Sequence, residues 1–217
     1  ARTDILALAN LDQDNPALRS VNALNADEIS SFLASPAEME SHAVFPVSHY
    51  GSGMSSLFIN LTLWIGAFML MIIFRTEVDS RGREGLTVQR AYQARYLLMG
   101  VFGIMQALIV SIGNLVIGVE HVSAIGYVLT ATILSLCYLA IIYGLVSAFG
   151  HIGRIIAVVY AFVQIPGASG LYPIEMTPDF FRAIHPFLPF TYGIGAMRET
   201  VGGFYGNHYW SNLATII

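Results

Sequence analysis

The chain of 217 residues contains no lysine, so all ten of its basic residues are arginine. A Walker A phosphate loop requires a lysine, and Schiff-base or pyridoxal-phosphate chemistry requires the amine of a lysine. The sequence therefore predicts a chain without a nucleotide site of its own, and we expect it to hold no cofactor.

Charged residues and cysteine are also scarce. Only 11% of the residues are charged, against roughly 25% in soluble domains. The net charge is −4 and no basic run occurs, so nucleic-acid binding has little electrostatic support. Cys137 is the single cysteine, which excludes an intrachain disulfide and a cysteine-based zinc cluster. The His-Glu-x-x-His and Gly-x-Ser-x-Gly signatures are absent, so we do not expect an enzyme.

Long uncharged runs dominate what is present. Residues 54–74 would form a helix of about 31 Å, which matches a hydrocarbon core of roughly 30 Å. Several such runs in succession predict an all-α membrane domain over residues 51–217. The predicted spans are 54–74, 96–119, 122–149 and 155–171, and a fifth begins near residue 210 and reaches residue 217, where the chain stops.

The first fifty residues differ from the rest, since they hold seven acidic residues, two arginines and three prolines. We predict that residues 1–50 are the end of an aqueous domain and that the chain is part of a longer protein. The segment 75–95 contains five arginines, and short cytoplasmic loops are enriched in such residues. This segment is therefore predicted to be cytoplasmic, which places residues 1–50 and 172–209 on the external side of the membrane.

A stripe of small or polar residues follows one face of the second predicted span. Small residues let membrane helices approach closely, so we expect this face to pack against another helix or a second subunit, with pore lining as the alternative. The stripe consists of Gly100, Gly103, Ala107, Ser111, Asn114 and Gly118.

Amide side chains inside the predicted spans are a second set of candidates. A buried amide without a partner is costly, so these side chains should face protein or water. Lining of a substrate path and interhelical hydrogen bonding are both open explanations, and the latter is the commoner. The residues are Asn60, Gln106, Asn114 and Gln164.

The arginine-rich segment has two explanations that the sequence does not separate. It could be a positive-inside anchor, or a docking element for a cytoplasmic partner that includes a short helix capped by Thr87. The arginines concerned are Arg75, Arg81, Arg83, Arg90 and Arg95.

The segment 165–204 is apolar but interrupted by five prolines. Repeated prolines prevent a single straight span. We therefore predict short re-entrant or interfacial helices, for example over residues 178–184 and 191–200.

Several stretches resemble the C-terminal membrane region of the phage infection protein (Pip/YhgE) family, which belongs with the ABC-2 type transporter permeases. They are residues 28–36, 45–54, 168–178 and 185–192, followed by Arg198-Glu199 and Gly202-Gly203. The resemblance implies a polytopic helical bundle of the ABC-2 permease type, with re-entrant helices before the last span. The re-entrant residues would include Ser169, Gly170, Pro173, Pro186, Pro189, Thr191 and Tyr192.

By this resemblance, the chain is a permease subunit of an exporter of hydrophobic or amphipathic substrates. It would contact membrane lipid, pair as a homodimer or heterodimer, and take energy from a separate cytoplasmic ATPase docked at residues 75–95. The alternative is a membrane scaffold or receptor that does not transport, as among relatives that resemble phage receptors or type VII secretion accessory proteins.

Overall fold

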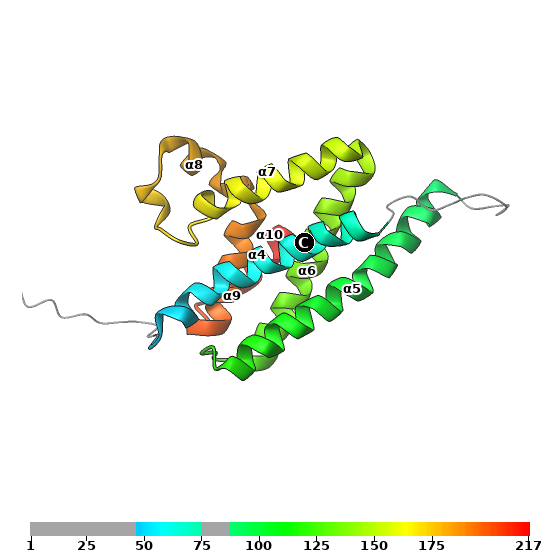
Figure 1. Cartoon of the computed structure of the whole chain (residues 1–217). Helices are drawn as coiled ribbons and strands as arrows, with labels where there is room; N and C mark the ends of the chain where they lie inside the picture. The colour runs from blue at the N-terminus through cyan, green and yellow to red at the C-terminus, as the bar shows by residue number, and fades with distance from the viewer. Residues whose placement is uncertain (1–46, 75–86) are drawn as a thin grey trace, which may run out of the picture. The chain divides into compact units, whose positions relative to one another are not determined.

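The computed structural model describes residues 47–74 and 87–217, which lie in a compact unit comprising Phe45–Ile217. All the regular elements in these ranges are helical, which confirms the all-α prediction. In chain order (Figure 1) they are α4 (Tyr50–Ile73), α5 (Val88–Ile117), α6 (Ala124–Phe149), α7 (His151–Gly167), the 3-10 turn η1 (Ile174–Met176), α8 (Asp179–Ile184), the 3-10 turn η2 (His185–Phe187), α9 (Pro189–Gly202) and α10 (His208–Ile216).

Three of the described helices, α4, α5 and α6, are long and apolar enough to cross a membrane. They have 24, 30 and 26 residues. Helix α5 starts before the predicted span because Thr87 caps it: the Thr87 side chain accepts a hydrogen bond from the Arg90 backbone N–H at 3.3 Å.

The fourth apolar helix, α7, has bounds that correct the prediction. It covers His151–Gly167 rather than residues 155–171, and its 17 residues extend roughly 25 Å. The early start follows from Gly150, whose φ of 59° lets the chain turn directly from α6 into α7. The helix ends one residue after Pro166, so it is shorter than the full thickness of a hydrocarbon core.

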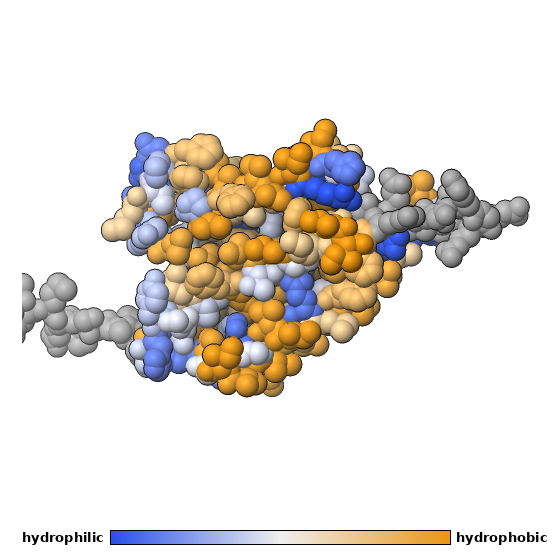
Figure 2. Space-filling model, viewed as in Figure 1, coloured by the Kyte–Doolittle hydropathy of each residue, from blue (hydrophilic) through white to orange (hydrophobic). Residues whose placement is uncertain are grey.

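Helix α6 is the centre of the bundle, since it contacts α4, α5, α7 and α9. Helix α5 lies against α6 and α4 but is the least buried of the three long helices. Only 22% of its apolar 18-residue stretch is buried, against 44% for the corresponding stretches of α4 and α6. Apolar residues also make up much of the visible surface in Figure 2. An apolar surface of this extent is typical of helices that face lipid.

Helix α9 has 14 residues and covers only part of the bundle. Its first turn lies beside the middle of α4 and α6, where the Phe190 ring is 5.7 Å from Trp64 and 5.4 Å from Tyr138 between centroids. Its last turn lies where α6 begins, because the Val122 backbone N–H donates to the Thr200 carbonyl at 2.9 Å. Helices α8 and α9 occupy the segments predicted to form short helices before the last span.

Candidate functional site

The small-residue stripe on α5 packs against α6. The Gly103 carbonyl accepts a hydrogen bond from Ser135 Oγ at 2.9 Å, and a Cβ at Gly100 would lie 3.6 Å from Leu136. Ala107 and Ser111 on the same face are fully buried. Gly118 has a different place, since it ends α5 in the left-handed conformation (φ 99°) with open space around it.

Two of the amide side chains join α5 to its neighbours. Gln106 Nε2 donates to the Thr62 carbonyl of α4 at 3.1 Å, and Asn114 Nδ2 donates to the Tyr127 hydroxyl of α6 at 3.0 Å. These contacts match interhelical hydrogen bonding, the commoner of the two explanations for such groups. A role in lining a substrate path stays a prediction.

Asn60 lies at the middle of the bundle, where α4, α6 and α9 meet. Its Nδ2 donates to the Ser56 carbonyl at 2.6 Å, and its Oδ1 accepts a hydrogen bond from the Tyr138 hydroxyl. Gly193 of α9 lies directly against these two groups, and a Cβ at this position would overlap both Asn60 Oδ1 and the Tyr138 hydroxyl. The close approach of α9 to this polar pair therefore requires glycine.

Gln164 of α7 caps the buried start of α9. The first N–H groups of a helix have no partner within the helix, and here Gln164 Oε1 accepts from the Phe190 N–H at 3.1 Å. Gln164 is fully buried, and its Nε2 has no hydrogen-bond partner among the described residues. Sequence reasoning identified Gln164 as a polar residue in a span but missed this cap, because the two residues are 26 positions apart.

The chain between α7 and α9 is fixed by its own polar contacts. Thr191 Oγ1 donates to the His185 carbonyl at 2.8 Å, and the Tyr192 hydroxyl donates to the Pro186 carbonyl at 2.7 Å. Pro173 directly precedes η1 and Pro189 is the first residue of α9, where its missing N–H costs nothing. Of the predicted re-entrant residues, Pro173 and Pro186 therefore lie beside or within the 3-10 turns, whereas Pro189, Thr191 and Tyr192 lie in the first turn of α9, and a re-entrant role stays a prediction.

The reversal after α7 is held from α9. Ser169 has a φ of 55°, a conformation that is uncommon for residues other than glycine. Arg198 Nη2 donates to the Ser169 carbonyl at 2.8 Å and to the Gly170 carbonyl at 3.3 Å. A Cβ at Gly170 would lie 2.6 Å from Leu57, so this turn also packs closely against α4.

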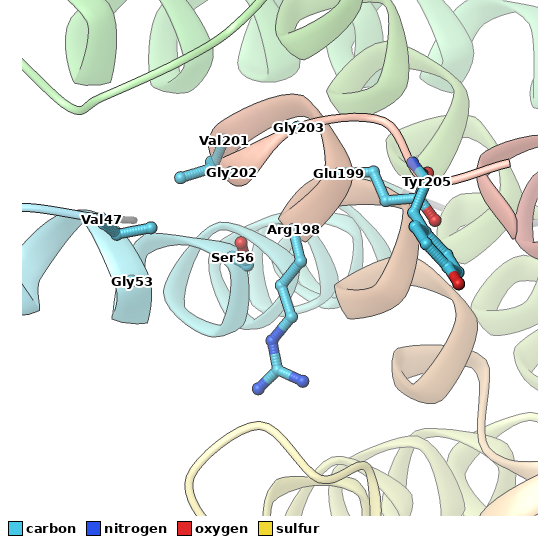
Figure 3. A pocket seen from close by; sticks show the side chains of 9 residues that line it. All are labelled: Val47, Gly53, Ser56, Arg198, Glu199, Val201, Gly202, Gly203 and Tyr205. Atoms are coloured by element: carbon cyan, nitrogen blue, oxygen red, sulfur yellow. The ribbon is translucent and has the colours of Figure 1, made fainter. Parts of the chain in front are cut away.

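A cavity of about 290 Å³ lies between the start of α4 and the end of α9 (Figure 3). Its lining combines apolar and glycine positions with one cation and one anion. The lining residues are Val47, Gly53, Ser56, Arg198, Glu199, Val201, Gly202, Gly203 and Tyr205. Figure 3 shows the side chains of Arg198 and Glu199 leaving α9 in different directions, with Glu199 toward Tyr205.

A polar clamp joins the same end of α4 to the turn between α5 and α6. Glu120 accepts hydrogen bonds from the Ser48 backbone N–H and from His49 Nδ1, both at 2.8 Å, and the Glu120 backbone N–H donates to Ser52 Oγ at 3.1 Å. These hydrogen bonds hold the pKa of the Glu120 carboxyl below its usual value. The bond from His49 has the largest effect, and the bond from Ser48 the next largest.

The arginines predicted to form a coupling loop are only partly within the described residues. Arg90 and Arg95 lie in the first turns of α5, whereas Arg75, Arg81 and Arg83 lie outside the described residues. A metal site finds no support in residues 47–74 and 87–217, where no group of three or more His, Cys, Asp or Glu side chains could hold an ion.

A bundle with three membrane-length apolar helices, in which the shorter α9 starts beside the middle of α4 and α6, defines an integral membrane protein. The family model described as "ABC-2 family transporter protein" matches residues 5–217, and the chain belongs to this family. The resemblance to the Pip/YhgE proteins is confirmed as well: over 193 residues the chain is 31% identical to "Uncharacterized protein YhgE" of Bacillus subtilis (strain 168). The match covers 88% of this chain and 24% of that protein, so the chain spans about a quarter of its relative. No solved structure matches the chain.

Proposed function

We propose that the chain is part of the permease subunit of an ABC-2 exporter in the bacterial plasma membrane, which moves a hydrophobic or amphipathic substrate outward with energy from a separate ATPase. The observation that carries the proposal is the half-length helix α9 inside a bundle that the ABC-2 family model covers. A helix that starts in the middle of a bundle creates an interruption at which a path can open.

The charge distribution supports an external energy source. Helices α4 and α6 contain no charged residue. The charged residues of α5, Arg90 and Arg95, lie in its first turns. Proton relays and ion-coupled transporters depend on ionisable groups inside the membrane. The absence of lysine excludes a Walker A loop from these 217 residues, so the nucleotide would be hydrolysed outside them, which agrees with a separate ATPase.

The test of this proposal reverses charge in the predicted coupling loop. In the full-length protein, Arg81→Glu with Arg83→Glu is expected to abolish both co-purification of an ATPase and export from cells. The matched control, Arg2→Glu with Arg19→Glu, makes the same charge change in the segment predicted to be external and should leave both unchanged. Unchanged export in the loop variant would contradict the coupling role.

The predicted topology has a separate test. In a Cys137→Ser background, Arg83→Cys should resist a membrane-impermeant maleimide added to intact cells, whereas Met176→Cys in the predicted external segment should react. Labelling of residue 83 from outside would reverse the orientation without affecting the helix assignment.

A non-transporting scaffold or receptor is the second candidate. It is favoured by the engagement of Gln106 and Asn114 in hydrogen bonds between helices, which leaves these side chains structural. Under this candidate, Gln106→Ala and Asn114→Ala leave function intact, while deletion of the external domain of the full-length protein removes it. The opposite pattern in an export assay supports the permease.

A further inference from the structure

The cavity between α4 and α9 contains two opposite charges that the described part of the protein leaves without an ionic partner. Arg198 and Glu199 are adjacent on α9, and adjacent residues on a helix do not face each other. Within residues 47–74 and 87–217, neither of them forms an ion pair. Both residues line the cavity, and their side chains point in different directions (Figure 3).

Each charged group has capacity left after its contacts to the protein. Both hydrogen bonds of Arg198 come from Nη2, so Nη1 can still donate. One oxygen of Glu199, Oε2, accepts from the Tyr205 backbone N–H at 3.1 Å, and Oε1 can still accept. A ligand with a negative and a positive group could therefore satisfy both side chains.

The size and the lining of the cavity indicate which part of a ligand it holds. A volume of about 290 Å³ is at the lower limit of ligand pockets, which span roughly 300–1,000 Å³. Most of the lining is apolar or glycine, with Val47, Val201 and Gly203 among it. This combination suits a small polar headgroup whose apolar remainder lies outside the cavity.

The position of the cavity agrees with a headgroup. It lies at the end of the bundle where α4 begins, and exposed aromatic residues gather there: Tyr50 is 83% exposed and Tyr205 is 60% exposed. Aromatic side chains of this kind are enriched at the level of lipid headgroups.

We propose that this cavity binds the headgroup of a zwitterionic amphiphile, with the phosphate diester at Arg198 and a primary ammonium at Glu199. The inference deepens the proposed function by naming a substrate class, and it rests on that function only in treating the amphiphile as cargo. Binding itself requires no ATPase.

The experiment measures the binding of short-chain phosphatidylethanolamine to the purified full-length protein in detergent by native mass spectrometry. Arg198→Gln and Glu199→Gln are each expected to weaken binding about tenfold, which corresponds to about 1.4 kcal/mol. Glutamine at position 199 keeps an acceptor for the Tyr205 N–H, so this variant removes charge with little effect on the fold. Arg182→Gln and Glu175→Gln are the matched controls, since these residues lie in α8 and η1, before α9 and outside the cavity lining.

The ligand arms separate the zwitterion from its alternatives. Phosphatidylglycerol lacks the ammonium, so Glu199→Gln should not weaken its binding, whereas free phosphoethanolamine should bind far more weakly than the lipid. Tighter phosphatidylethanolamine binding by Glu199→Gln would show an anion site and overturn the proposal. Equal binding of free phosphoethanolamine and the lipid would overturn it too, as would wild-type affinity in both cavity variants.

Export measurements keep this inference distinct from the proposed function. If Arg198→Gln and Glu199→Gln weaken binding while the Arg81 and Arg83 variant exports normally, the site stands and the coupling role fails. If phosphatidylethanolamine binding is unaffected by the cavity variants while the loop variant loses export, the cavity proposal alone fails.

Discussion

Ser56 and Asn60 lie one turn apart on α4, yet their surroundings differ. Asn60, at the middle of the bundle, has both ends of its amide bonded and is pressed against Gly193 of α9. Ser56, beside the cavity, is just as buried, but its hydroxyl has no hydrogen-bond partner among the described residues. Asn60 thus holds three helices together, whereas one turn away the Ser56 hydroxyl is left unsatisfied beside the cavity. A ligand that forms a hydrogen bond with such a group removes the cost of leaving it unsatisfied.

The largest effect should come from the closest contact at the middle. Gly193→Ala places a methyl group on Asn60 Oδ1 and the Tyr138 hydroxyl, so α9 must move away from α4. We expect a loss of about 3 kcal/mol in the free energy of unfolding, measured by denaturant titration in detergent. Gly113→Ala is the control, since a Cβ there meets open space and alanine favours the helix by about 0.5–1 kcal/mol. Equal effects of the two substitutions would contradict the close approach of α9.

The next effect concerns the hydrogen bond itself. Tyr138→Phe leaves Asn60 Oδ1 buried without a donor and should cost about 2 kcal/mol of unfolding free energy. Adding Asn60→Leu removes the stranded acceptor, so the double variant should be less destabilised than the sum of the single variants. Simple additivity in this double-mutant cycle would indicate that the bond contributes nothing.

Removal of a hydroxyl should raise the free energy of unfolding at the end of the bundle, although it lowers it at the middle. Ser56→Ala removes an unpartnered buried hydroxyl and improves helix propensity, so we expect a gain of about 1 kcal/mol in lipid-free detergent. Ser135→Ala is its counterpart in the α5–α6 contact, where Ser135 Oγ donates to the Gly103 carbonyl, and it should lose about 0.5–1 kcal/mol. A loss of stability in Ser56→Ala would show that the hydroxyl is bonded.

The smallest effect is the pH dependence of the clamp at Glu120. The folded protein lowers the pKa of this carboxyl from its usual value of 4.5, so the clamp contributes fully above that value. Its contribution is lost as the pH falls through the lower, folded-state pKa. The measurement is the ¹³C carboxyl shift of Glu120 against pH, whose midpoint should lie below 4.5 and rise in His49→Ala. An unchanged midpoint in His49→Ala would refute the hydrogen bond from His49 as the main cause of the lowered pKa.

The helices of the bundle could be predicted from the sequence because each depends on local properties. Uncharged runs located α4, α5 and α6, and Thr87 was predicted as the cap of a short helix, which the structure shows to be the start of the long helix α5. The small-residue stripe indicated a packing face, since residues three or four apart share one side of a helix. Gly118 follows the same spacing but ends the helix, and spacing alone does not separate the two roles.

The site could be predicted only in part because its contacts join distant segments. Gln164 meets Phe190, and Arg198 meets Ser169, only after α7 and α9 have packed together. The pairing of Gly193 with Asn60 and Tyr138 depends on three helices at once. Neither composition nor periodicity predicts such contacts, so the cap of α9 and the cavity could be identified only in the structure.

The buried start of α9 also constrains how the protein is assembled. A helix of 14 residues extends about 21 Å, too short to be inserted as a membrane span on its own. Its first N–H groups would be stranded in lipid until Gln164 of α7 is in place to accept one of them. We therefore expect helix α9 to enter the bundle only after α4, α6 and α7 have assembled, with α10 packing against α9 in turn.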